Sequence, residues 1–187
     1  GGKSSKTVIS GLRILGGGAA GLYCNGSSPI IQNCIVSGSR GNAMVFAGSQ
    51  AQILNCTVAH NSALPGQAAV TCWDSPITIC NTIIAENRPE LVSIFAPTDQ
   101  PVVTYSCVEG GWVGDGNIDA DPLFSELGDL HLLSETGRWD GAAWVVDDAT
   151  SPCIDAGDPA VDVGAEPAPN GDIINMGAFG GTDEASM

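Results

Sequence analysis

The stretch Ser28-Pro29-Ile30-Ile31-Gln32-Asn33-Cys34-Ile35-Val36 decides the fold, because its apolar residues around an asparagine return along the chain. Close copies cover residues 50–58 and, with one extra residue, 75–84. Weaker copies at 8–14 and 103–108 carry Gly11 and Tyr105 at the marker position. The markers at 11, 33, 55, 81 and 105 are 22, 22, 26 and 24 residues apart. Self-similarity at a period of about 20 to 50 residues is typical of a solenoid.

The period is too short for parallel strands joined by helices, and the residues between the copies are Gly, Ser, Ala and short β-prone runs. Stacked coils of short strands, about 4.8 Å apart, satisfy this pattern. We therefore predict an all-β fold, a right-handed parallel β-helix of about five coils over residues 1–108. From 109 the composition shifts to Gly, Asp and Pro, which predicts an irregular C-terminal cap or anchor-like module over 109–187.

The marker asparagines are predicted to form a structural ladder. Ile31 and Ile35 alternate with Asn33, so all three are expected to point inward, and Cys34 outward or into the turn. Asn33, Asn55 and Asn81 would then stack, each amide bonding the next. Asparagine also tolerates the left-handed backbone of a sharp turn. The alternative is that these are unrelated surface-turn asparagines.

The charge and composition narrow the range of functions. Six Lys and Arg against 21 Asp and Glu give a net charge of −15, so nucleic acid is not an expected partner. With 43% hydrophobic and 14% charged residues, the chain has the composition of a folded domain. No apolar run reaches the roughly 18 residues of a membrane span, and none is predicted.

Seven cysteines favour an oxidising compartment, and their spacing does not match a zinc knuckle. Cys34 and Cys56 follow the marker in neighbouring coils, so their Cα atoms are expected within disulfide reach. Cys107 and Cys153 complete the set of disulfide candidates. The alternative is that they are buried thiols packed as small apolar residues.

Two groups of motifs resemble known families. Residues 21–29, together with 31–34, resemble the coils of right-handed β-helix repeat proteins that bacteria secrete. The segments 117–124, 128–132, 151–159 and 175–180 resemble the C-terminal module that follows such helices in surface proteins of the "choice-of-anchor" type. The resemblance implies an extracellular, surface-associated β-helix.

Catalytic residues are not predicted. A polysaccharide lyase needs a cluster of carboxylates on a cation with a basic residue beside it, and a glycosidase needs two carboxylates across a groove. The acids of the solenoid segment do not recur in register; they are Asp74, Glu86, Glu90 and Asp99.

The best predicted metal site is a calcium loop. Oxygen-bearing side chains alternate through this segment, and the set comprises Asp115, Asn117, Asp119, Asp121 and Glu126. Ala120 stands where such a loop has glycine, and helices are not expected on either side. The alternative is that these side chains cap turns.

Three aromatic residues near turns, Tyr23, Trp73 and Trp112, are candidates for stacking on sugar rings. The alternative is packing in the core or cap.

These observations favour a non-catalytic, extracellular structural or adhesive module. Its first coil lacks a cap, so we expect it to dock on a neighbour's cap and build a filament or surface layer, or to contact other surface proteins. The alternatives are a carbohydrate-binding module, a remnant of a polysaccharide lyase or hydrolase, and one end of a longer adhesin.

Overall fold

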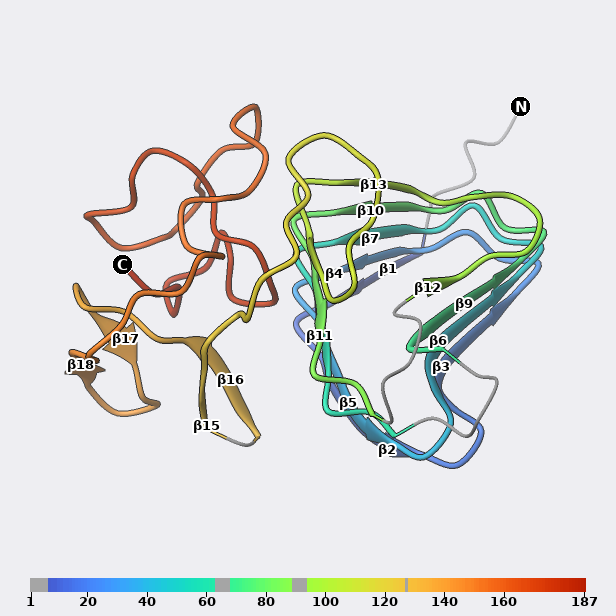
Figure 1. Cartoon of the computed structure of the whole chain (residues 1–187), viewed down its shortest axis with the longest axis horizontal. Coiled ribbons are helices and arrows are strands. Elements are labelled where there is room, and N and C mark those ends of the chain that lie inside the picture. The colour runs from blue at the N-terminus through green and yellow to red at the C-terminus, as the bar shows by residue number, and fades with distance from the viewer. Residues whose placement is uncertain (1–6, 63–67, 89–93, 127) are drawn as a thin grey trace.

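The computed structural model describes residues 7–62, 68–88, 94–126 and 128–187. The described residues contain strands and turns but no helix, and hence none long and apolar enough to cross a membrane. Strands β1 to β14 form three parallel sheets that wind into a β-helix of four coils and a partial fifth (Figure 1). The predicted all-β parallel β-helix is confirmed.

Along each strand of sheet A, the side chains point alternately toward solvent and toward the core. The sheet contains β1 (Val8–Ser10), β4 (Ile30–Gln32), β7 (Gln52–Leu54), β10 (Thr78–Cys80) and β13 (Val102–Thr104). The central residue of each strand points inward, and these residues align across the sheet: Ile9, Ile31, Ile53, Ile79 and Val103. The period of two along each strand therefore places one apolar stack in the core.

Sheet B is largely buried on both faces except along its edge strand at residues 13–17, where Arg13 and Leu15 are exposed. It contains β2 (Arg13–Gly17), β5 (Ile35–Ser39), β8 (Thr57–Ala59), β11 (Ile83–Ala85) and β14 (Cys107–Val108). Consecutive residues such as Ile83 and Ile84 are both buried, which explains the unbroken apolar runs. One face looks into the solenoid and the other lies under the C-terminal module.

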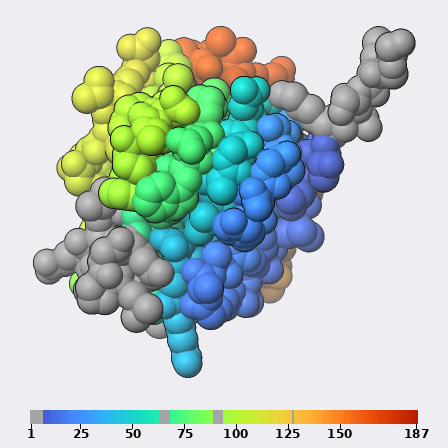
Figure 2. Space-filling model, turned by 90° about the vertical axis from the view of Figure 1, so that its right-hand side faces the viewer, coloured from blue at the N-terminus to red at the C-terminus, as the bar shows by residue number. Residues whose placement is uncertain are grey.

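Sheet C closes each coil. It contains β3 (Ala20–Asn25), β6 (Asn42–Ala47), β9 (Val70–Trp73) and β12 (Ile94–Phe95). Met44, Phe46, Val70 and Cys72 project from it into the main core. Figure 2 shows successive coils as neighbouring bands of colour from blue to yellow-green.

The C-terminal module lies along the side of the solenoid, against sheet B (Figure 1). It contains two small antiparallel pairs, β15 (Phe124–Glu126) with β16 (Asp129–Leu132) and β17 (Arg138–Trp139) with β18 (Trp144–Val145). The module was expected to cap the end of the solenoid, but it mainly covers the outer face of sheet B. Among the described residues, a loop over 109–118 covers the end of the last coil, and its Trp112 packs against the core.

Candidate functional site

One residue per coil forms the sharp corner between sheets A and B. At these five positions the backbone is left-handed, with φ values of 65°, 48°, 46°, 50° and 47° at Gly11, Asn33, Asn55, Asn81 and Tyr105. Glycine adopts this conformation freely and asparagine tolerates it, so the marker residues are the ones the turn requires. We call these five positions the asparagine corner.

The corner amides bond the C-terminal module. Asn33 Nδ2 donates to the carbonyls of Ala178 (3.1 Å) and Gly180 (2.8 Å), and Asn55 Nδ2 donates to Asn175 O (3.1 Å). Asn81 Oδ1 accepts from the backbone N–H of Asp158 at 2.8 Å. The three amides therefore hold one returning segment against three successive coils.

The corner also carries one contact of the expected ladder. Asn81 Nδ2 donates to Asn55 Oδ1 at 3.4 Å, which is a long hydrogen bond. The predicted inward direction is confirmed for Ile31 but wrong for Asn33 and Ile35, because the left-handed residue breaks the strand alternation. From the second coil on, the residue after the corner points into the core and is fully buried, as Cys34 and Cys56 are, whereas Ile35 faces the module with Ala178.

A second asparagine pair lies inside the solenoid and was not predicted. Asn61 Nδ2 donates to Asn87 Oδ1 at 2.9 Å, and Ser39 N donates to Asn61 Oδ1 at 3.0 Å. Both asparagines are buried, and their Nδ2 groups also bond backbone carbonyls. The residues before Ser39, Asn61 and Asn87 are again left-handed: Gly38, His60 and Glu86. Each lies five residues after a marker, which is the signal that identifies this ladder in the sequence.

Tight glycine contacts fit the module to the corner. A Cβ on Gly180 would lie 2.6 Å from Asn55 Nδ2 and 2.1 Å from Asn175 O. A Cβ on Gly157 would lie 3.0 Å from Asn81 Oδ1. The module backbone approaches the corner so closely that a larger side chain is excluded.

A buried carboxylate organises the returning segment. Glu166 Oε1 accepts from the backbone N–H groups of Asn175 (2.9 Å) and Gly181 (2.7 Å). Burial raises the pKa of Glu166 above its ordinary value, because a charge is costly away from water. The carboxylate fixes both ends of the stretch that contacts Asn33 and Asn55.

The predicted disulfides are not formed, since all seven cysteines are free thiols. The thiols donate to backbone carbonyls instead: Cys34 to Gln32 O at 3.2 Å, Cys56 to Leu54 O at 3.3 Å and Cys107 to Ala120 O at 3.2 Å. In register, Cys34 and Cys56 have parallel Cβ vectors about 4.8 Å apart, beyond the roughly 3.5 to 4.5 Å of a disulfide. Burial raises the pKa of the Cys56 thiol well above its ordinary value.

The predicted calcium ligands do not converge. Asn117 Oδ1 accepts from Ser106 N at 3.0 Å, while its Nδ2 donates to Val103 O at 2.9 Å. Asp119 and Asp121 accept from the backbone N–H groups of Gly110 and Leu123. In the described part of the chain no three acidic, His or Cys side chains are grouped to hold a metal, Asp115 and Glu126 included. The run ends the last coil and caps turns, which was the alternative reading.

Two family models match the sequence. The model described as a right handed beta helix region covers residues 2–114, more than half of the chain. The chain belongs to the right-handed β-helix family. A second model, described as disaggregatase related, matches residues 103–157, so the last coil and the first part of the module of this β-helix protein are similar to that family. Comparisons with curated proteins and with solved structures gave no match.

The aromatic candidates of the β-helix separate into two environments. Tyr23 and Trp73 on sheet C are 61% and 48% exposed, and Trp73 meets Phe95 edge to face at 5.4 Å. Trp112 is half-buried against the core, so its predicted sugar contact gives way to packing.

Two open cavities border the β-helix. One, of about 340 Å³, lies between the first coil and the module; Gly11, Arg13, Asn33, Phe179 and Glu184 line it. The corner residue of the first coil is Gly11, which has no side-chain amide to bind the module. The other, of about 550 Å³, is lined by Glu86, Arg88, Glu109, Asp119 and Asp121 beside the last coils.

Proposed function

We propose that this β-helix protein is a non-catalytic structural module of an extracellular or cell-surface assembly. One observation carries the proposal: the row of polar side chains that repeats in register, Asn33, Asn55 and Asn81, bonds the chain's own C-terminal module. A substrate site needs such groups to face a ligand. Here the three side-chain amides hold the C-terminal module against three successive coils.

Other polar side chains that could bind a ligand or a metal also stabilise the chain's own backbone. Asn117 closes a polar row inside the last coils, in which Thr82 N donates to Ser106 Oγ at 3.1 Å. Asp119 and Asp121 accept from turn backbones. These contacts support a structural role. The resemblance of the coils to secreted β-helix proteins supports the proposed extracellular setting.

The test is an assay for turnover of polysaccharides. The 187-residue chain would be incubated with a panel of neutral and acidic polysaccharides, with and without calcium. New reducing ends and unsaturated products would be measured beside an active lyase as a positive control. We expect no product. Turnover that rises with the concentration of the chain would overturn the proposal and favour a lyase or hydrolase.

A second candidate function, glycan binding, is favoured by the exposed rings of Tyr23 and Trp73 on sheet C. Uncharged aromatic faces can stack on sugar rings. A glycan array with Trp73→Ala tests it, and Trp144→Ala is the matched control because Trp144 is also exposed, at 41%, but lies in the C-terminal module. Binding that only Trp73→Ala abolishes would establish this function.

A further inference from the structure

His131 is a buried titratable side chain that takes no part in the asparagine corner. It lies on β16, and 9% of its side chain is exposed. Its ring stacks on Phe179, with the centroids 3.5 Å apart and the planes 16° from parallel. Phe179 stands between Ala178 and Gly180, whose carbonyls both accept from Asn33 Nδ2. The histidine therefore touches the segment that is bonded to the second coil.

One ring nitrogen of His131 is fixed by a carboxylate. Nδ1 lies 2.5 Å from Asp129 Oδ1, two residues earlier on the same strand. An ionised carboxylate can only accept, so Nδ1 carries the proton of the neutral ring and donates it. Burial would raise the pKa of Asp129, but the hydrogen bond from His131 outweighs burial and holds this pKa below its ordinary value of 3.8. Ser125 Oγ also donates to this carboxylate, at 3.1 Å.

The other ring nitrogen of His131 has no hydrogen bond. Nε2 is buried, and none of the described residues donates to it or accepts from it. Glu184 Oε2 lies 3.8 Å away. In the neutral ring both atoms are acceptors, so they cannot bond each other. A proton on Nε2 would turn it into a donor and remove the cost of a buried, unpaired polar atom.

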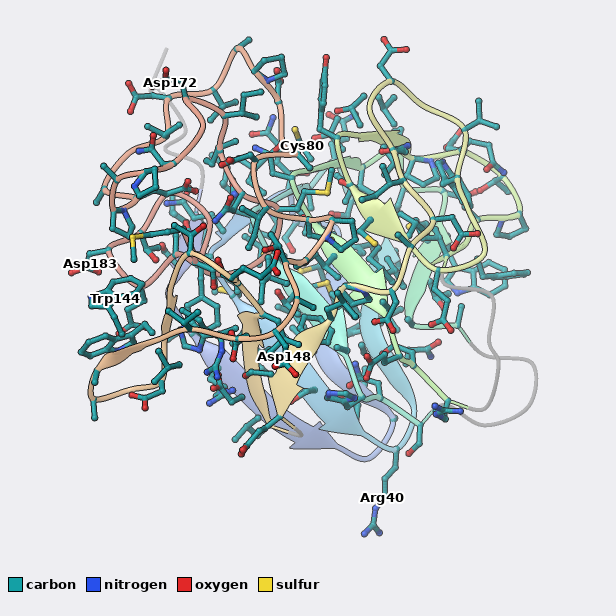
Figure 3. The ribbon with its side chains drawn as sticks, turned by 60° about the vertical axis from the view of Figure 1, so that its left-hand side comes forward. Arg40, Cys80, Trp144, Asp148, Asp172 and Asp183 are labelled. Carbon is teal, nitrogen blue, oxygen red and sulfur yellow. The ribbon has the colours of Figure 1, made fainter. Side chains whose placement is uncertain are left out.

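Two carboxylates would share the positive charge of a protonated ring. Among the described residues, only Asp129 and Glu184 lie within ion-pair distance of the ring nitrogens. Figure 3 shows Asp183, which precedes Glu184, at the edge of the C-terminal module. Opposite charges on both sides favour the charged form of a histidine and offset the cost of its burial. The other charged or titratable groups on the neighbouring elements are Glu126 on β15, Arg138 on β17, Asp183, His60 beside Phe124, and Arg13, which bonds Gly128 O.

The backbone beside Glu184 is already held along β16. Ser186 Oγ donates to Leu132 O at 2.7 Å, and Met187 N donates to Gly137 O at 2.8 Å. The Glu184 side chain is 50% exposed, so it has room to move. A shift of about 1 Å in this side chain alone would bring its carboxylate within hydrogen-bond distance of Nε2.

We propose that His131 is a pH-sensitive latch, which on protonation donates Nε2–H to Glu184 and fastens residues 182–187 to β16. The proton comes from solvent, and the bond from Nδ1 to Asp129 is kept. Histidine is the side chain that ordinarily changes charge between about pH 5 and 8. The protonated ring joins β16 to residues 182–187 and, through Phe179, to the segment bonded to Asn33. The C-terminal module is thus held more firmly in mildly acidic surroundings. This inference does not depend on the proposed structural function.

The first test compares stability at two pH values. Urea denaturation of the wild type and of Glu184→Ala would be measured at about pH 5.5 and about pH 8, on either side of the ordinary histidine titration. Alanine offers Nε2 neither a donor nor an acceptor, and a half-exposed position tolerates it. Because the bond requires a charged histidine, we expect the variant to lower the folding equilibrium constant roughly threefold at the lower pH only. Asp183→Ala, at the exposed neighbouring residue, is the matched control and should have the same effect at both pH values.

The second test observes the ring itself. The chain has two histidines, and His60 contacts Glu86 at 3.4 Å. His60→Asn leaves His131 as the only imidazole, and asparagine tolerates the left-handed backbone at this position, where φ is 56°. Nitrogen NMR should find the proton on Nδ1 at the higher pH and protons on both nitrogens at the lower pH.

Three results would overturn the latch: a proton on Nε2 at the higher pH, a ring that is still neutral at the lower pH, or an equal effect of Glu184→Ala at both. None of them bears on the proposed function, which fails only on polysaccharide turnover.

Discussion

The residues of the asparagine corner combine two tasks at one position. Their left-handed backbone turns the chain from sheet A to sheet B, and their amides reach the C-terminal module. Glycine performs only the first task, at Gly11. Tyr105 adopts the same conformation at a cost of about 1 to 2 kcal/mol. Replacing a corner asparagine therefore has two separable effects, one on the left-handed turn and one on the hydrogen bonds to the C-terminal module.

We expect Asn55→Gly to destabilise the protein by about 1 to 3 kcal/mol, because Asn175 O loses its donor and Asn81 Nδ2 its acceptor in a buried setting. Asn55→Ala should cost about 1 kcal/mol more, since alanine resists the left-handed backbone. Urea denaturation measures both. A glycine variant as stable as the wild type would show that the amide bonds contribute nothing.

The first corner can be improved. Gly11 has φ +65° and open space around a Cβ, so asparagine fits there and restricts the unfolded chain. We expect Gly11→Asn to stabilise the protein by about 0.5 kcal/mol. Gly11→Val should destabilise it, because a β-branched residue resists this backbone. Thermal unfolding of the three proteins decides the matter; equal midpoints for Asn and Val would contradict the argument.

The marker residues were readable in the sequence, but the direction of their side chains was not. Alternation along a strand predicts directions only while the backbone stays extended. One left-handed residue resets the alternation, so Cys34 turned inward and Ile35 outward.

At the level of elements, sheet B shows what the pattern of a strand can and cannot reveal. Runs such as Ile83-Ile84 indicate a strand covered on both faces. They do not say what covers it. The partner surface is built from Leu130, Leu132, Met176 and Ala178, which belong to short islands without a repeat. Strand positions were therefore predictable, and the packing partner was not.

The β17–β18 hairpin provides a pH-dependent element. Arg138 Nε and Nη2 donate to Asp147 at 2.9 and 3.0 Å, and this contact holds the pKa of Asp147 below its ordinary value of 3.8. A lowered carboxylate pKa adds stability above the unfolded-state pKa, and that stability is lost as the pH falls through the folded-state pKa. We expect the hairpin to loosen only below about pH 4.

The Trp139–Trp144 pair reports this change, since the two rings lie 5.6 Å apart across the hairpin. Circular dichroism of the coupled rings during an acid titration measures it. Asp147→Asn should remove this acid step, and Trp144→Phe should remove the signal itself. A step centred near neutral pH in the wild type would mean that another group controls the hairpin.

The whole molecule keeps its thiols inside. Six of the seven cysteines are buried and Cys80 is half-buried, and burial raises the pKa of Cys72 to about 12. Only the thiolate reacts with disulfide reagents. At pH 8 we expect at most the Cys80 thiol to react rapidly in the native protein, and all seven after denaturation. Fast reaction of several native thiols would show that the coils open readily.

Placing the C-terminal module was beyond sequence reasoning. The repeat relates residues about one coil apart, which is why the solenoid was visible. The contact between Asn33 and Gly180 joins residues 147 positions apart and has no periodic signature. The calcium prediction for 115–126 meets a related limit: a run of oxygen donors has the same spacing whether it binds an ion or its own turns.

The returning segment meets the coils in reverse order, Asn81 first through Asp158 and Asn33 last through Gly180. During synthesis the coils emerge first and can stack as they leave the ribosome. The returning segment, residues 158–180, is synthesised after the coils and then bonds them from Asn81 back to Asn33. A polypeptide interrupted before residue 158 would keep every strand of the solenoid and the β15–β16 pair, but would lack the bonds from Asn33, Asn55 and Asn81 to the returning segment. The bonds of the corner are therefore complete only once residues 158–180 have been synthesised.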